Sequence, residues 1–339
     1  MPLGTDLLLH ESPDADAIKT DVKRLAAVVI KSARRYRTPL AMPLMDLTRE
    51  KAALLHLLGI EEGENEFHFT EPPDTAALER FDGSLGGETT PAVHASTESI
   101  CLVATQRDLL PMGLCIGPFS LMTKLLSDPI TPVFLAGSGA TADEEPEVKL
   151  MEIALELSTR LALGIIQRQI DAGAKMMVIA EPAANKVFFS PAQIAAGSDV
   201  FEKIAMAPNR RIRALLKGAG VDLFFHCCGE LVDPMVRAFA SLDPAILSLG
   251  SSRVLWNDAA LVPKSTVLFG NLPSKQFYSD SLVSVDDVRH RSRELIERMR
   301  EARHPFILGT ECDVLSVPDC RPTILAKVDA MLERDDVAK

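Results

Sequence analysis

The stretch Val221-Asp-Leu-Phe-Phe-His-Cys-Cys-Gly229 is a short apolar run that leads into a histidine, two cysteines and a glycine. An apolar run of this length, bounded by a glycine, is typical of a buried strand. Side chains two residues apart on a strand point to the same side. We therefore expect His226 and Cys228 to share one side of the strand's carboxyl end, and Cys227 to point into the opposite wall.

Similar apolar runs recur along the chain, and helical patterns separate most of them. We predict eight strands, centred near residues 41, 101, 113, 177, 223, 247, 267 and 307. Strands that alternate with helices form parallel sheets, and eight such units favour a closed (β/α)8 barrel, the TIM barrel. An open, doubly wound sheet is the structural alternative. No G-x-G-x-x-G motif follows the first strand, so a dinucleotide-binding fold has no support.

Helices are predicted from apolar spacing and from capping residues. The strongest pattern covers residues 147–172, and Gly173 follows it as a suitable C-cap. Other helices are expected to start at Ser190, to end near Lys217, and to cover residues 14–36, 48–58, 121–126, 230–241, 284–303 and 319–332. Two segments rich in acidic residues and glycine are predicted to be loops: a surface loop over residues 61–87 and a mobile loop over residues 136–146.

Length and composition bound the class of protein. The chain has 339 residues, of which 47% are hydrophobic, and we predict one domain over residues 1–339. A helical N-terminal extension over residues 1–38 would precede the barrel, residues 39–335. The net charge of −11 argues against a nucleic-acid-binding surface, which needs a concentrated basic face.

The sequence also carries signals about the cell compartment. No apolar run approaches the roughly 18 residues that a membrane crossing needs, and the N-terminus does not resemble a signal peptide. The six cysteines are scattered apart from one adjacent pair, which is more typical of reduced thiols or metal ligands than of a disulfide framework. We expect a cytoplasmic protein.

In a parallel barrel, active sites form where the strands end. The predicted strand ends carry one imidazole, two thiols and several carboxylates: Asp46, Glu181, His226, Cys228, Asn271, Glu311, Cys312 and Asp313. Zinc prefers thiolate and imidazole ligands, and a catalytic zinc site has three protein ligands and one open position. We therefore predict a zinc site formed by His226, Cys228 and Cys312. The alternative is a packed histidine beside an inert buried thiol.

The predicted ligand set indicates a particular chemistry. Two thiolates make the metal centre electron-rich, which suits the binding of a substrate thiol. Coordination lowers the pKa of such a thiol, so the thiolate persists at neutral pH and can attack an electrophilic methyl group. Hydrolytic zinc chemistry stays open as an alternative.

The order His226-x-Cys228 followed by Cys312 resembles the zinc site of the uroporphyrinogen decarboxylase/methionine synthase superfamily. The nearer match is its corrinoid-linked methyltransferase branch, typified by the methylcobalamin:coenzyme M methyltransferases. The resemblance extends over about residues 40–335 and includes four more stretches: Met45-Asp-Leu-Thr-Arg-Glu-Lys-Ala52, Ile116-Gly-Pro-Phe-Ser-Leu121, Glu181-Pro182 and Phe269-Gly-Asn-Leu272.

This resemblance implies that zinc activates a small thiol, such as coenzyme M, or another small methyl acceptor. The methyl group would come from methylcobalamin on a separate corrinoid-binding protein. We expect Asp46 and Glu181 to act in catalysis, with Glu181 or the substrate thiol in the fourth zinc position. Substrate-binding roles are expected for Phe119, Asn271, Glu311 and Asp313.

Two other functions stay open. One is a metal-free decarboxylase of uroporphyrinogen type, although the chain opening lacks the Arg-rich segment by which those enzymes bind their tetracarboxylate substrate. The other is a non-catalytic homologue that only docks a corrinoid protein. Residues 247–253 carry no carboxylate where cobalamin-independent methionine synthases supply a glutamate. The sequence also leaves open whether the chain forms a homodimer.

Overall fold

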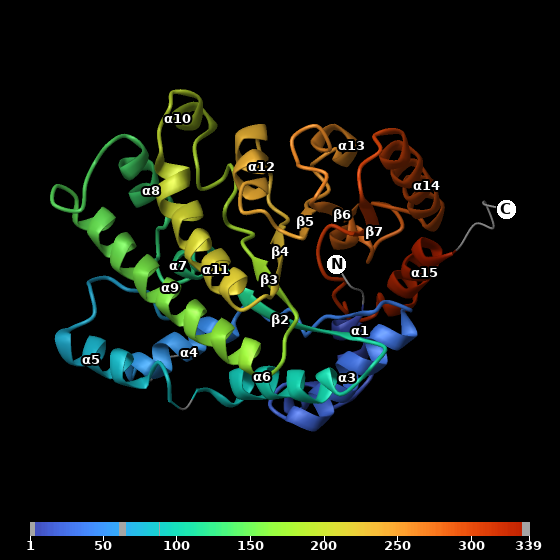
Figure 1. The fold of residues 1–339 in the computed structure, drawn as a ribbon, viewed down its shortest axis with the longest axis horizontal. Coiled ribbons are helices and arrows are strands. Elements are labelled where there is room, and N and C mark those ends of the chain that lie inside the picture. Colours follow the sequence, from blue (N-terminus) through green and yellow to red (C-terminus); the bar gives the residue numbers. More distant parts are fainter. Residues whose placement is uncertain (1–3, 61–65, 88, 334–339) are drawn as a thin grey trace.

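A curved sheet of seven parallel strands forms the centre of the fold, with helices along its outer side (Figure 1). The computed structural model describes residues 4–60, 66–87 and 89–333. In these ranges the strands pair in chain order and are β1 (Leu40–Ala41), β2 (Leu110–Ile116), β3 (Met176–Ala180), β4 (Asp222–Cys227), β5 (Ile246–Leu249), β6 (Val267–Leu272) and β7 (Phe306–Thr310). The predicted α/β fold of TIM-barrel type is confirmed.

Three helices precede the first strand: α1 (Thr5–Leu9), α2 (Ala15–Ile18) and α3 (Val22–Arg35). Those that follow are α4 (Arg49–Leu58), α5 (Thr75–Ser84), α6 (Pro91–Ala104), α7 (Pro118–Thr123), α8 (Ile130–Gly137), α9 (Pro146–Asp171), α10 (Pro191–Ala195), α11 (Ala207–Gly218), α12 (Asp233–Ala240), α13 (Leu255–Asp258), α14 (Val285–Glu301) and α15 (Arg321–Leu332). A π-helical turn, η1 (Phe201–Met206), and a 3-10 turn, η2 (Ser274–Gln276), complete the helical segments of the described ranges.

The strand predicted near residue 101 is wrong, because this segment lies within helix α6. Pro91 occupies the first turn, where its missing N–H is tolerated. Val93, Ile100 and Val103 are buried at helical spacing, whereas Leu102 is 37% exposed. The apolar run is therefore one side of an amphipathic helix, and the described sheet has seven strands in place of eight.

The surface loop predicted for residues 61–87 is wrong in part. Helix α5 occupies its second half and begins after Asp74, whose side chain accepts a hydrogen bond from the Ala77 N–H at 2.8 Å. Residues 61–65 lie outside the described residues. The loop predicted for residues 136–146 begins two residues later, since α8 runs to Gly137, and its mobility stays a prediction.

The two sides of the sheet have different neighbours. The interior side carries a buried cluster drawn from alternate strand positions: Met42, Met112, Leu114, Met176, Val178, Phe224, Ile246 and Phe269. The intervening positions face the surrounding helices, among them Cys115, Ile179, Phe225, Cys227 and Leu247. A strand buried on both sides is apolar throughout, which explains the continuous apolar run of β4.

Helix α1 bridges the open side of the curved sheet. The described parts of β1 and β7, at its two edges, do not pair with each other. At one edge the Thr5 hydroxyl donates to the carbonyl of Met42, just after β1, at 3.0 Å. At the other, Ser316 after β7 donates its N–H to the carboxylate of Asp6 at 2.6 Å. The helices of the N-terminal segment thus hold the first and last strands together (Figure 1).

None of the helices in the described part of the chain combines the length and the apolar character that crossing a membrane requires.

We predict that Asp6→Ala lowers the free energy of unfolding by about 1–3 kcal/mol, because the Ser316 N–H loses its hydrogen-bond acceptor. Urea unfolding followed by circular dichroism measures the change. Asp16→Ala serves as the control, since that carboxylate is exposed and pairs only with Lys19. Equal unfolding midpoints for wild type and Asp6→Ala would contradict the bridging role of α1.

Candidate metal centre

His226 projects from β4 to the interior side of the sheet, two residues beyond Phe224 of the interior cluster. Its side chain is buried, with 1% of its surface exposed. The Nδ1 atom lies 3.0 Å from the hydroxyl oxygen of Ser248, which pairs in register with His226 on β5. A metal-binding histidine is commonly oriented by such a hydrogen bond on its other ring nitrogen. Ser248 therefore leaves Nε2 for a ligand.

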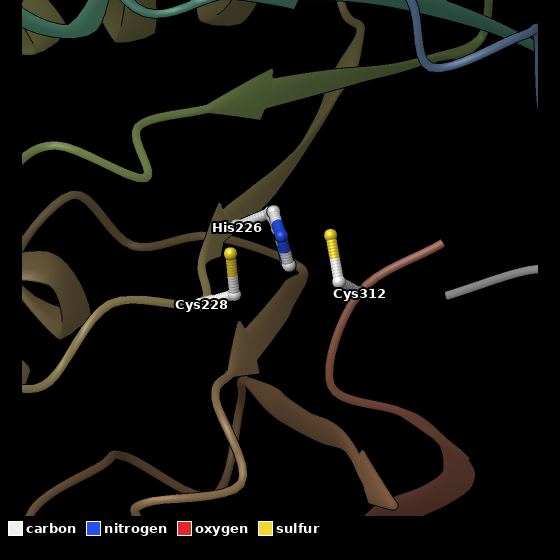
Figure 2. Close-up of side chains that lie close together, drawn as sticks. All are labelled: His226, Cys228 and Cys312. Atoms are coloured by element: carbon white, nitrogen blue, oxygen red, sulfur yellow. The ribbon is translucent and has the colours of Figure 1, made fainter. Parts of the chain in front are cut away.

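Cys228 and Cys312 complete a group with His226, as predicted. The Nδ1 or Nε2 of the histidine and the two sulfur atoms all lie within 4.8 Å of one another. Cys228 follows β4 and Cys312 follows β7, and Figure 2 shows the three side chains turned toward one another. No other set of three such residues in the described ranges meets this spacing.

The two sulfur atoms interact directly. A hydrogen bond from the Cys312 thiol lowers the pKa of Cys228 below the ordinary cysteine value, and His226 lowers it further against the effect of burial. The same hydrogen bond raises the pKa of Cys312. A metal ion that binds both sulfur atoms displaces any proton that they hold.

Cys227 faces away from this group, as predicted. It is fully buried, and its sulfur lies 3.7 Å from the carbonyl oxygen of Ala184. Burial raises its pKa, so it stays a neutral thiol within the outer layer of the core.

Lys275, which sequence reasoning missed, lies beside Cys228. Its ammonium donates to the carbonyl oxygen of Cys228 at 3.4 Å and lies 3.9 Å from a carboxylate oxygen of Glu311. Burial lowers the pKa of Lys275, but the negative charges of Cys228 and Glu311 outweigh this effect and raise it. The lysine comes four residues after Asn271, a predicted strand end, and this position in the sequence could have identified it as a candidate site residue.

Glu311 and Asn271, both predicted to bind substrate, are engaged with the protein itself. The same Glu311 oxygen accepts hydrogen bonds from the backbone N–H and the hydroxyl of Ser251, at 3.2 and 2.8 Å. The Asn271 amide donates to the carbonyls of Gly250 and Arg253, at 2.8 and 2.9 Å. Both side chains hold the loop after β5 at the rim of the metal centre, and substrate binding by them stays a prediction.

Asp313, the third predicted substrate-binding residue, is 7% exposed and lies next to Cys312 in the chain. Its carboxylate accepts a hydrogen bond from the Val314 N–H at 2.8 Å. Burial, followed by the nearby charge of Asp6, raises the pKa of Asp313 to about 7.

Glu181, predicted as a catalytic residue and possible fourth ligand, is not among the residues that meet at the metal centre. Ala180 pairs in register with His226, so Glu181 is at the level of Cys227 and faces the helices with it. Its carboxylate accepts the backbone N–H groups of Phe119 and Ser120, at 3.1 and 2.8 Å, at the start of α7. Asn209 donates to it as well, at 2.8 Å. These contacts give Glu181 a role in fixing α7 to β3.

Phe119 and Asp46 also have well-defined neighbours. Phe119, predicted to bind substrate, is fully buried and packs against Phe189, with the ring centroids 4.7 Å apart and the rings tilted by 41°. Asp46 accepts the backbone N–H of Thr48 at 3.0 Å and its hydroxyl at 2.6 Å, just before α4. Burial raises the pKa of Asp46, but these hydrogen bonds outweigh it and lower the value. The catalytic role predicted for Asp46 stays a prediction.

The donor set fits a zinc ion. One imidazole and two thiols within 4.8 Å supply the nitrogen and sulfur ligands that zinc prefers. Three protein ligands leave one position for a substrate, and both cysteines are partly exposed. A zinc ion bound by these three residues would therefore keep one position open.

Comparisons with known proteins find similarity in both sequence and structure. Residues 10–333 match the family described as uroporphyrinogen decarboxylase (URO-D). The structure is similar to that of a methyltransferase from Methanosarcina mazei, with a TM-score of 0.65 and 16% sequence identity over 96% of this chain and 89% of that chain. At this identity the likeness shows a shared fold. No curated protein matches the sequence.

We predict that the purified protein retains about one zinc per chain after dialysis, and that His226→Ala, Cys228→Ser and Cys312→Ser each lose it. Ser248→Ala should weaken zinc binding by about 10–100-fold, because the imidazole loses its orienting partner. Elemental analysis and chelator competition measure both effects. Cys320→Ser, outside the group, is the matched control. Zinc content near zero in the wild type would contradict the assignment.

A second prediction concerns pH and Glu181. Burial raises the pKa of Glu181, against the hydrogen bonds from Asn209 and Ser120, which lower it. The folded protein therefore binds this proton more tightly than the unfolded chain. Its contribution to the free energy of unfolding falls as the pH rises from the ordinary glutamate pKa, about 4.3, through the raised value.

Glu181→Gln removes this titration. The free energy of unfolding of the wild type should therefore fall relative to that of the variant as the pH rises through that window. Urea unfolding at several pH values measures the difference, with the exposed substitution Glu79→Gln as the control. A difference for Glu181→Gln that does not change with pH would contradict the buried environment assigned to this carboxylate.

Proposed function

Because this chain belongs to the uroporphyrinogen decarboxylase family and gathers one histidine and two cysteines at the carboxyl ends of its strands, we propose that it is a zinc-dependent methyltransferase. It moves a methyl group between a corrinoid and a small thiol. The observation that carries this proposal is the spacing of His226, Cys228 and Cys312, whose ligand atoms lie within 4.8 Å of one another.

The composition of the centre favours a thiol as methyl acceptor. When bound, zinc supplies the charge that keeps an incoming thiol ionised at neutral pH. Ser248 orients the imidazole of His226, and the half-exposed Lys275 adds a positive charge at the rim. The methyl group then moves by a displacement: sulfur bonds to the methyl carbon, the cobalt–carbon bond breaks with its electron pair left on cobalt, and the thiol proton goes to solvent.

The co-substrate in this proposal is methylcobalamin on a corrinoid-binding protein, and coenzyme M is one candidate acceptor. The end of the sheet that carries the metal ligands must then receive both a small thiol and a protein-bound corrinoid. The methyltransferase from Methanosarcina mazei adds to the support through the fold that the two chains share.

The test is to mix zinc-loaded protein with methylcobalamin and a panel of small thiols, including coenzyme M, and to follow the cobalamin absorption spectrum. We expect demethylation with at least one thiol, and its loss in Cys312→Ser and after zinc removal. Cys320→Ser should retain the activity.

Three results would contradict the proposal. Demethylation that is unaffected by chelation would remove the role of zinc. Turnover of an acidic tetrapyrrole without metal would identify a decarboxylase. Binding to a corrinoid protein that survives His226→Ala, without demethylation by any thiol, would identify a non-catalytic docking protein.

A further inference from the structure

If the proposed function holds, the charge at the metal centre affects whether it binds a substrate thiol in its ionised form. Two cysteine thiolates neutralise a divalent zinc ion, and a neutral imidazole adds no charge. A third thiolate, from a substrate, therefore leaves the centre with a net negative charge. A nearby cation would stabilise that state, since opposite charges attract strongly where the surroundings are only partly hydrated.

Lys275 is placed to supply that cation. Its ammonium donates to the carbonyl oxygen of Cys228 at 3.4 Å, while its side chain is 52% exposed. An ammonium carries three N–H donors, more than this single carbonyl uses. Its neighbour Ser274 contacts the backbone of Cys312, so the lysine is next to both cysteines.

The turn that carries Lys275 is fixed at both ends. On one side, the Ser274 hydroxyl donates to the carbonyl oxygen of Cys312 at 3.1 Å. On the other, the buried Lys327 of α15 donates to the carbonyl of Phe277 at 2.8 Å and pairs with Asp280 at 3.0 Å. Turn η2 is thus tied to one cysteine ligand through Ser274 and to the other through Lys275.

A purely structural role, as the partner of Glu311, explains this placement less well. The distance of 3.9 Å between the two groups is at the limit of an ion pair. The same Glu311 oxygen is already satisfied by the backbone and hydroxyl of Ser251. The Glu311 carboxylate is therefore stabilised without Lys275, whereas a thiolate that binds at the centre would be stabilised by a nearby cation.

We propose that Lys275 is a substrate-binding residue whose ammonium holds the incoming thiolate beside Cys228 and Cys312. This role rests on the proposed function and adds to it a residue that selects the ionised form of the thiol. It acts on the sulfur atom itself, so it applies to an uncharged thiol such as 2-mercaptoethanol as well as to acidic ones.

The experiment uses cobalt(II) in place of zinc, because sulfur ligands on cobalt give an intense charge-transfer absorption. 2-Mercaptoethanol is titrated into the cobalt-loaded full chain, and the rise of the absorption gives a dissociation constant. We expect Lys275→Gln to raise this constant about tenfold, and Lys275→Arg to keep it within about threefold of wild type, since arginine retains the charge.

Lys186→Gln is the matched control. Lys186 follows β3, pairs with Glu230 and has a half-exposed side chain, so this substitution changes the net charge equally without touching the cysteines. It should change the dissociation constant by less than about twofold.

The outcomes separate the role of Lys275 from the proposed function. Equal thiol affinity in wild type and Lys275→Gln, or equal losses in the Lys275 and Lys186 variants, overturns the role of Lys275 and leaves the proposed function standing. A Lys275→Gln protein that no longer holds cobalt also overturns it, since the residue would then support the ligands. Wild-type protein that holds cobalt but binds no thiol contradicts the proposed function and the role of Lys275 together.

Discussion

The structure depends on the alternation of side chains along β4, a strand that is buried on both sides. Successive residues must point either to the interior cluster or to the outer helices, and a one-residue slip would exchange the two sets. Phe225 and Cys227 pack outward, so Phe224 and His226 must point inward. The imidazole therefore lies inside the curved sheet, where the residues that follow β4 and β7 meet.

The same alternation explains which site residues could be predicted from the sequence. The set of His226, Cys228 and Cys312 follows from an i, i+2 pair at one strand end and a cysteine at another. The sequence could have excluded Glu181 from this set. It comes one residue after Ala180, which pairs with the inward-facing His226, so its side chain points outward. Its place at a strand end suggested a ligand, but its direction leads to the start of α7, where two backbone N–H groups need an acceptor.

Other features depend on contacts that no local pattern contains. Ser248 is one polar residue in an apolar strand, and only the register of β4 against β5 places it beside His226. Lys275 reaches Cys228 because Ser274 and Lys327 hold its turn, and those partners are 38 and 50 residues distant in the chain from the groups that they bind. The strand near residue 101 was predicted from apolar character alone. The helical spacing of Val93, Ile100 and Val103 makes this segment part of helix α6 instead. Closure by α1 likewise rests on hydrogen bonds of Thr5 and Asp6 to groups that are 37 and 310 residues away in the chain.

The proposed centre binds a zinc ion through two cysteines and one histidine, with one position left for a thiol. X-ray absorption at the zinc K edge tests it most directly, because the number of sulfur neighbours is measured at the metal itself. We predict two sulfur neighbours at about 2.3 Å in the zinc-loaded protein and a third when a substrate thiol is added. A spectrum with only nitrogen and oxygen neighbours, unchanged by thiols, would contradict the claim.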